Sequence, residues 1–211
     1  IQRLVGSEMC IRDRYYKVLS APKHFVANNE EYRRHSGSSE VPMKVLRDYY
    51  LPAFKSSIVD AGAQSIMTAY NALNGIPCTA NTFLLKDILR NEWQFPGWVV
   101  TDCGAIYDIH VNHKYVDDPV QAVALSLKAG TDLNCGSYFR LHLKNAFDQG
   151  LVTMEDIDQA LLRIFVTRIK LGVFDPPSMN PYSRISKDVV DSKHHQELAH
   201  EIALQSIVLL K

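Results

Sequence analysis

The sequence predicts an α/β fold built on a parallel β-sheet. Short apolar runs rich in β-branched residues alternate with amphipathic segments of helical length. Strands that alternate with helices of this length are typical of βα units, in which the strands lie parallel. The clearest run, Trp98–Thr101, ends abruptly at Asp102 and a turn of small residues. Ligands and catalytic groups lie at the carboxyl ends of parallel strands, so Asp102 occupies a position typical of a catalytic or ligand-binding residue.

The first units follow in order along the chain. Residues 16–20 form a β-prone run, and the polar residues 28–40 indicate a loop. Arg33, Arg34 and His35 in this loop are candidates for the rim of a site, but we favour the interpretation that they are solvated. Apolar residues at helical spacing then begin at Leu46 and predict a helix, for which Gly62 is the predicted stop. Residues 65–70 are the second predicted strand, and an Asn-Gly turn follows it.

The later units repeat this alternation. Asn81 is a predicted helix cap, and the apolar residues after it share one helix face. The third strand, Trp98–Thr101, precedes a helix that begins at Asp118-Pro119, and residues 131–134 form a short fourth strand. Two further helices are predicted over residues 138–147 and 154–171. Four βα units amount to half of an eight-stranded barrel.

Both ends of the chain depart from this pattern. Residues 174–190 contain three prolines and indicate an extended linker between domains. Residues 191–211 hold a helix and the beginning of a strand, which we interpret as the start of a second domain. Residues 1–14 resemble, over residues 5–14, the in-frame translation of a transposon-type sequencing adapter. We interpret them as an artefact and exclude them from the fold, so the first domain spans residues 15–173.

Composition excludes several classes of function. Lys and Arg number 23 and Asp and Glu number 23, so the charge supports neither a nucleic-acid nor a membrane-surface partner. No apolar run approaches the ~20 residues of a membrane span. The 4 cysteines lack metal-ligand spacing and are too sparse for a disulfide scaffold. They are either all thiols or include one bridged pair. No metal or organic cofactor is implied, and no glycine-rich phosphate loop is present.

Polar side chains occur at four predicted strand ends. These are Lys23-His24, Tyr70-Asn71, Asp102 and Asp132. In a parallel barrel such ends converge on one face, where a cation, an imidazole, a phenol and carboxylates suit a ligand rich in hydroxyl groups. Asp132 we interpret as mainly structural, bonding loop amides. For Asp102 an alternative remains, because aspartate also caps helices, and a helix could follow it directly.

Six motifs occur in a set order along the chain. They are Lys23-His24-Phe25 and the segments 50–54, 66–75, 97–106, 129–133 and 205–211. Together they resemble glycoside hydrolase family 3 over nearly all of residues 15–211. The resemblance implies that the first domain is the C-terminal half of a TIM-type (β/α)8 barrel. It also implies that residues 191–211 begin an α/β sandwich domain.

The resemblance implies a retaining exo-acting β-glycosidase, whose two carboxyl groups lie about 5–5.5 Å apart. Asp102 matches the nucleophile, which forms a covalent glycosyl-enzyme. Lys23, His24 and Tyr70 match residues that bind the sugar, and a cation such as Lys23 would keep the nucleophile ionised. The family's acid/base glutamate belongs to the domain beyond Lys211, so we expect the chain alone to be inactive.

The residue after the nucleophile bears on the substrate. Cys103 resembles the β-xylosidase/α-L-arabinofuranosidase branch, because many β-glucosidases of the family carry tryptophan there. We therefore expect a β-D-xylosidase acting on an oligosaccharide or glycoside, with α-L-arabinofuranosidase as a side activity and β-glucosidase as the alternative. Members of this branch are often secreted or periplasmic.

Two readings from other classes remain. A non-catalytic carbohydrate-binding relative would lack Asp102 or the Lys-His pair, and both are present. An unrelated aldolase-type barrel would use Lys23 as a Schiff base, which the surroundings of Asp102 do not favour. Nothing in the sequence indicates the oligomeric state.

Overall fold

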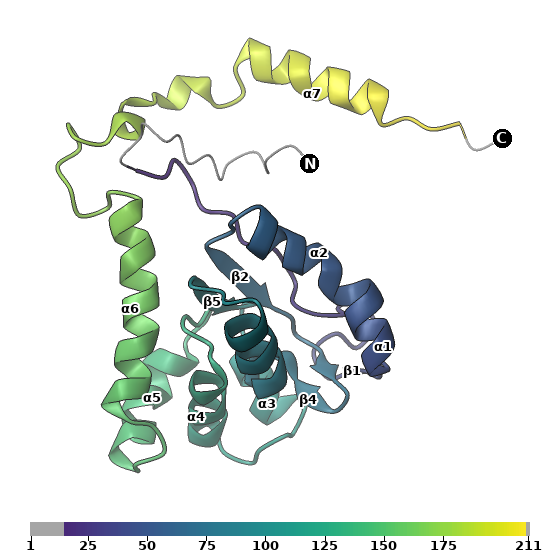
Figure 1. Ribbon diagram of the computed structural model, residues 1–211, viewed down its shortest axis with the longest axis vertical. Coiled ribbons are helices and arrows are strands. Elements are labelled where there is room, and N and C mark those ends of the chain that lie inside the picture. The colour runs from purple at the N-terminus through teal and green to yellow at the C-terminus, as the bar shows by residue number, and fades with distance from the viewer. Residues whose placement is uncertain (1–14, 210–211) are drawn as a thin grey trace. The chain divides into compact units, whose positions relative to one another are not determined.

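The computed structural model describes residues 15–209, and the adapter interpretation of residues 1–14 lies outside that range. The chain divides into two compact units, Ile1–Val173 and Phe174–Lys211 (Figure 1). The identity of these units as barrel domain, linker and second domain stays a prediction. In the described part, none of the helices is both long enough and apolar enough to cross a bilayer.

Within residues 15–173, the first unit contains five short strands and a series of helices. The strands are β1 (Ser38–Ser39), β2 (Ser65–Thr68), β3 (Ala72–Leu73), β4 (Ile76–Pro77) and β5 (Trp98–Thr101). The first helical stretch comprises α1 (Met43–Val45), η1 (Leu46–Tyr50), α2 (Leu51–Lys55) and η2 (Ser56–Asp60), of which η1 and η2 are π-helical. The other helices are η3 (Cys78–Ala80), η4 (Phe83–Glu92), α3 (Ala105–Val111), α4 (Pro119–Ala129), α5 (Tyr138–Asp148) and α6 (Met154–Lys170).

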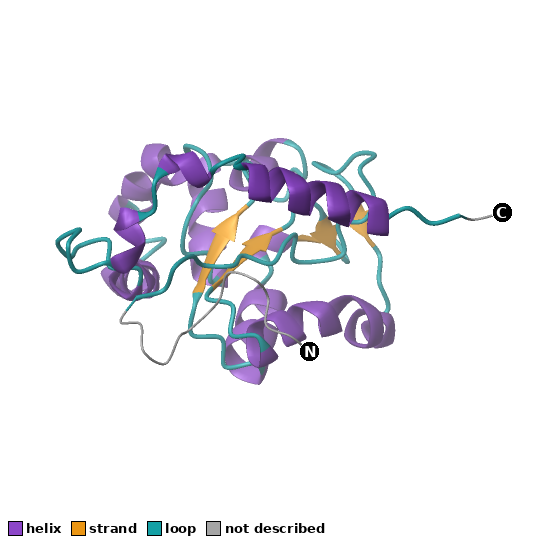
Figure 2. Ribbon diagram, turned by 90° about the horizontal axis from the view of Figure 1, so that it is seen from above, coloured by secondary structure: helices purple, strands orange, loops and turns teal. Residues whose placement is uncertain are grey.

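The strands that position the site run parallel. β2 pairs with β5 in the register Ser65–Trp98 to Thr68–Thr101. Single parallel bridges extend this pairing on both sides, from Phe25 to Thr68 and from Val100 to Leu133. Four successive chain segments therefore lie in sequence order with their carboxyl ends together. Helices flank these strands (Figure 2), which confirms the predicted α/β class.

Two apolar clusters form the core. The first packs Phe25 and the β2 residue Ile66 against the fully buried face of η4, namely Leu84, Leu85, Ile88 and Leu89. The second joins α3, α4 and α5 through residues that include Ile106, Ile109, Val123 and Ala146. The first cluster confirms that the apolar face predicted for the helix after Asn81 points inward.

Local signals explain where these helices begin and end. The Asn81 side chain accepts a hydrogen bond from the Leu84 N–H at 3.2 Å, as predicted for a helix cap. Asp118 caps α4 in the same way through the Val120 N–H at 3.0 Å. Gly130 ends α4 in the left-handed conformation, with φ of 116°, which glycine adopts without a Cβ clash.

Three sequence predictions were wrong in detail. Residues 16–20 are not a strand, and the pairing occurs at Phe25 instead, because backbone groups at both ends of the run have other partners. The Tyr16 N–H donates to the Lys170 carbonyl at 2.8 Å, and the Ser20 carbonyl accepts from Ser65 Oγ at 2.9 Å. The strand over residues 131–134 is reduced to the single bridge at Leu133.

The third concerns the C-terminal segment. The helix predicted there is α7 (Lys193–Gln205), preceded by short 3₁₀ turns η5 (Pro181–Arg184) and η6 (Lys187–Val189). Residues 206–209 are not a strand. A strand needs a partner for its backbone groups, and the described residues of this unit provide no other strand.

A buried carboxylate joins three elements of the first unit. Asp132, whose side chain is 1% exposed, accepts hydrogen bonds from Arg90 at 2.9 Å and from Arg163 of α6 at 2.8 Å. It also accepts the N–H of Val99 in β5 at 2.8 Å. Burial lowers the pKa of Arg90 to about 10, so the guanidinium stays charged at neutral pH. Asp132 is thus structural, as predicted, but the amide it bonds belongs to a strand.

We expect Asp132→Ala to lower the free energy of unfolding by about 3–5 kcal/mol, because it leaves two partly buried guanidinium groups without their counter-charge. Urea denaturation of the protein provides the measurement. Glu92→Ala is the matched control, since it removes the partner of Arg47 at an exposed site. Equal losses for the two variants would show that Asp132 has no special role.

Candidate active site

Asp102 extends from the end of β5 with both carboxylate oxygens bonded. Its N–H donates to the Thr68 carbonyl at 3.2 Å, which continues the β2–β5 pairing by one residue. Oδ1 accepts the Cys103 N–H at 2.7 Å, and Oδ2 lies 3.0 Å from His24 Nε2. The side chain is only 14% exposed. The carboxylate is therefore oriented at the strand end and still reachable.

The geometry does not support the alternative that Asp102 caps the following helix. The N-cap position of α3 is Gly104, in the left-handed conformation with φ of 88°. No side-chain cap bond is made there, and Asp102 contributes only its backbone carbonyl, which accepts the Ala105 N–H at 3.0 Å. The side chain of Asp102 is thus directed to the strand-end cluster rather than to α3.

His24 reaches Asp102 because the next residue is anchored beside β2. The Phe25 N–H donates to the Met67 carbonyl at 2.8 Å, and the Phe25 carbonyl accepts the Ala69 N–H at 2.9 Å. Lys23 is exposed and forms no hydrogen bond or ion pair with another residue between 15 and 209. The contact with Asp102 that the sequence suggested for Lys23 is made instead by the imidazole of His24.

Tyr70 follows β2 and lies beside the same carboxylate. Its hydroxyl donates to the Cys103 carbonyl at 2.9 Å, across the turn that carries Asp102. Burial raises the pKa of Tyr70, and the negative charge of Asp102 raises it further. The phenol is therefore protonated at neutral pH, which the hydrogen bond it donates to the Cys103 carbonyl requires. The structure brings together His24, Tyr70 and Asp102 from three neighbouring strand ends.

Further residues lie near Tyr70: His35, a rim candidate for which the sequence favoured a solvated position, and Asp108 and His113, which were not assigned to the site from sequence. The His35 ring lies 4.3 Å from the Tyr70 ring, measured between centroids, and His35 Nδ1 lies 2.7 Å from Asp108 Oδ2. His113 Nε2 lies 2.8 Å from the Tyr70 backbone carbonyl. No spacing signal could have revealed these contacts, since His35 and Asp108 are 73 residues apart in the chain.

A disulfide settles the question that the cysteines left open. Cys103 and Cys135 are bonded, which ties the turn after Asp102 to the loop after Leu133. The Gly104 N–H reinforces this link by donating to the Cys135 carbonyl at 2.8 Å. Cys78 is a buried free thiol, and burial raises its pKa to about 12. Among the three cysteines within residues 15–209, only the bridged pair is therefore close to the candidate site.

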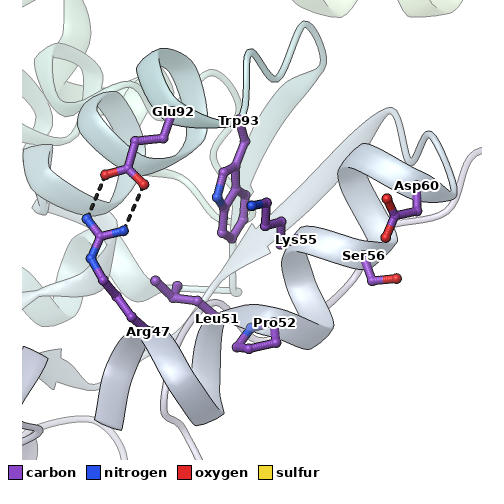
Figure 3. A pocket seen from close by; sticks show the side chains of 8 residues that line it. All are labelled: Arg47, Leu51, Pro52, Lys55, Ser56, Asp60, Glu92 and Trp93. Atoms are coloured by element: carbon purple, nitrogen blue, oxygen red, sulfur yellow. Dashed lines mark hydrogen bonds and ion pairs between the residues drawn. The ribbon is translucent and has the colours of Figure 1, made fainter. Parts of the chain in front are cut away.

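Cavities within the described residues of the first unit include two that bear on the site. One of about 230 Å³ adjoins the Asp102 turn and is lined by Gly104, Tyr107, Asn134, Gly136, Ser137 and Tyr138. A larger one of about 490 Å³ is lined by helical residues and by Trp93, with Arg47 and Glu92 paired across it (Figure 3). None of the strand-end residues lines the larger cavity, so volume does not identify the site. Within the described range, no three His, Cys, Asp or Glu side chains are grouped to hold a metal.

Comparison with known proteins identifies the family. Residues 4–167 match the model of the glycosyl hydrolase family 3 N-terminal domain. The chain belongs to glycosyl hydrolase family 3. The resemblance found in the six sequence motifs is thereby confirmed.

Family 3 relatives similar to this chain include fungal enzymes. Over 202 residues it is 43% identical to the protein named "Probable exo-1,4-beta-xylosidase bxlB" of Aspergillus clavatus. It is 40% identical to the exo-1,4-β-xylosidase bxlB of Emericella nidulans. Each alignment covers 92% of this chain and 26% of the relative, so the chain spans about a quarter of their length.

Solved family 3 structures resemble the fold as well. The exo-β-xylosidase XlnD, in complex with a xylobiose aziridine activity-based probe, superimposes with a TM-score of 0.89 at 34% identity. That comparison covers 95% of this chain and 27% of XlnD. A β-glucosidase from Listeria innocua gives a TM-score of 0.82 at 28% identity, over 92% of this chain and 27% of the glucosidase.

Replacing both Cys103 and Cys135 by serine should lower the free energy of unfolding by about 3–4 kcal/mol, because the bridge closes a loop with a separation of 32 residues. Urea denaturation with and without a reductant provides the measurement. The reductant should destabilise the unsubstituted protein and leave the double variant unchanged. A protein indifferent to reduction would contradict this prediction.

Proposed function

We propose that this chain is the nucleophile-bearing part of a retaining exo-β-glycosidase. The observation that carries the proposal is the Asp102 carboxylate at the end of β5, held by His24 at 3.0 Å and by the Cys103 N–H at 2.7 Å. A nucleophilic carboxylate must be oriented, and these two contacts hold both of its oxygens in place.

The proposed fold is the C-terminal half of a (β/α)8 barrel, followed by a linker and the start of an α/β sandwich domain. Four parallel segments in sequence order support the half barrel. Helix α6 adds support, because several of its apolar side chains are exposed. Leu161 is 44% and Ile169 is 59% exposed, as expected of a face that further barrel elements would cover.

In the proposed mechanism, Asp102 attacks the anomeric carbon of a terminal β-linked sugar. The bond to the leaving-group oxygen breaks as the bond to an Asp102 oxygen forms, which gives a covalent glycosyl-enzyme. Water then releases the sugar with retention of configuration. Lys23, His24 and Tyr70 are proposed to bind sugar hydroxyl groups beside the nucleophile. The acid/base group would be the glutamate that the family resemblance assigns to the following domain.

The proposed substrate is a β-D-xyloside. The curated relatives reported above are named exo-1,4-β-xylosidases, and XlnD superimposes more closely than the Listeria β-glucosidase. The disulfide at Cys103, where many β-glucosidases of the family carry tryptophan, also supports this branch. α-L-Arabinofuranosidase is a proposed side activity, and β-glucosidase is the alternative.

The disulfide also supports a proposed location. Stable disulfides form in oxidising compartments and are rare in the reducing cytosol. The Cys103–Cys135 bridge therefore favours a secreted or periplasmic protein.

Replacement of Asp102 by glycine should abolish turnover, with a loss of about 10⁴-fold or more, because the attacking group is removed. The chain spans about a quarter of the length of its relatives. The test therefore uses a hybrid protein, in which this chain replaces the segment that it matches in the Emericella nidulans enzyme. A 2-deoxy-2-fluoro-xyloside should label Asp102, as located by peptide mass spectrometry. Asp117→Gly, at an exposed carboxylate, is the control. An active, unlabelled Asp102→Gly hybrid would refute the nucleophile and favour a non-catalytic site.

The same hybrid tests the substrate. Its kcat/KM for an aryl β-xyloside should exceed that for the matching β-glucoside by about 10-fold or more, since pockets discriminate a small extra group by about 10- to 200-fold. Paired steady-state assays provide the measurement. A preference for the glucoside would establish the alternative.

A further inference from the structure

A buried aspartate lies behind Tyr70, outside the residues assigned to the sugar. Asp108 is on α3, the helix that follows the Asp102 turn, and is 3% exposed. Its carboxylate accepts hydrogen bonds from Asn112 Nδ2 at 2.5 Å and lies 2.7 Å from His35 Nδ1. Removing a carboxylate from water is costly unless such partners compensate it. Asn112 and His35 provide this compensation for Asp108.

The partner of Asp108 comes from a distant loop. His35 belongs to the polar segment 28–40, and its side chain remains 45% exposed although one ring nitrogen is bonded to a buried group. Arg34 Nε donates to the other nitrogen, Nε2, at 3.4 Å. The two ring nitrogens thus have different partners, and the loop is tied to α3 through the contact between His35 Nδ1 and Asp108.

The His35 ring that contacts Asp108 also packs against the ring of Tyr70. The His35 and Tyr70 ring centroids are 4.3 Å apart with the planes inclined at 56°. The Tyr70 hydroxyl is held by the Cys103 carbonyl and its backbone carbonyl by His113, at 2.9 and 2.8 Å. The imidazole packs against this ring, and the Arg34 guanidinium lies over the same ring, 5.1 Å from its centroid. Without His35 the Tyr70 ring would lose one of these two contacts, and the hydroxyl beside Asp102 would have more freedom.

We propose that His35 and Asp108 are positioning residues that hold Tyr70 in place beside the nucleophile Asp102. The proposal rests on the proposed glycosidase function. Neither residue is proposed to touch the sugar or the reacting atoms. Asp108 orients His35, the His35 ring restrains Tyr70, and the Tyr70 hydroxyl is kept at the turn that presents the Asp102 carboxylate. A displacement of about 1 Å in a catalytic site can cost about 10²-fold in rate.

The test measures kcat and KM of the hybrid on an aryl β-xyloside. His35→Ala and Asp108→Leu should each lower kcat/KM by about 10- to 100-fold, mostly in kcat. Asp108→Asn keeps an oxygen acceptor for His35 Nδ1, so its kcat/KM should stay within about 5-fold of the value for the unsubstituted hybrid. His35→Phe, which keeps a ring against Tyr70 but removes both nitrogens, should lie between His35→Ala and the unsubstituted hybrid.

A double-mutant cycle separates positioning from general structural support. In a Tyr70→Ala background the loss from His35→Ala should shrink to about 2-fold or less, because residues in contact are not additive. Arg47→Gln is the matched control, since it breaks an exposed ion pair at the larger cavity (Figure 3) and should leave kcat and KM unchanged. If His35→Ala costs as much without Tyr70 as with it, the positioning role is overturned.

The outcomes also separate this proposal from the function on which it rests. If Asp102→Gly is inactive while every His35 and Asp108 variant is fully active, the glycosidase stands and the positioning pair falls. If Asp102→Gly remains active, the function itself fails. Should Asp108→Leu not fold, His35→Phe and Asp108→Asn decide the matter, because one changes a half-exposed side chain and the other preserves shape.

Discussion

The bonding of the buried Asp132 carboxylate is the interaction on which the rest of the first unit depends. It joins a guanidinium from η4, a guanidinium from α6 and a backbone amide of β5 at one point. β5 carries Asp102 at its end, so the contacts that hold this strand also place the proposed nucleophile. A slip of one residue in a strand would reverse every side chain on it. The bonded amide of Val99 fixes a position inside the strand.

The start of β5 is equally constrained. A Cβ at Gly97 would lie 2.2 Å from the Gln64 carbonyl oxygen, so only glycine permits the approach that begins the β2–β5 pairing. The carbonyl of Gly97 in turn accepts a hydrogen bond from Arg90 at 2.5 Å. The same arginine therefore bonds both Asp132 and the entry to β5. Backbone geometry at Gly97 and the ion pair between Arg90 and Asp132 together fix the position of β5 and of the Asp102 carboxylate at its end.

Beyond the end of β5, contacts between loops hold the turn that carries Asp102. The Cys103–Cys135 bridge restrains the turn on one side, and the Tyr70 hydroxyl bonds the same turn on the other. These links connect chain segments that the parallel strands bring close together. The sheet supplies the proximity, and covalent and polar contacts between the loops supply the orientation.

The sequence by itself determined the features that rest on local pattern. The apolar face of η4, the caps at Asn81 and Asp118, and the parallel order of β2 and β5 follow from periodicity and capping chemistry. So does the position of Asp102 at a strand end.

Only the tertiary structure decided which partners these residues have. It placed His24 rather than Lys23 against Asp102, bridged Cys103 to Cys135, and brought His35 to Asp108. It also moved the first strand pairing from residues 16–20 to Phe25. The physical reason is that periodicity records which face of an element is buried, whereas a hydrogen bond between distant segments leaves no trace in spacing.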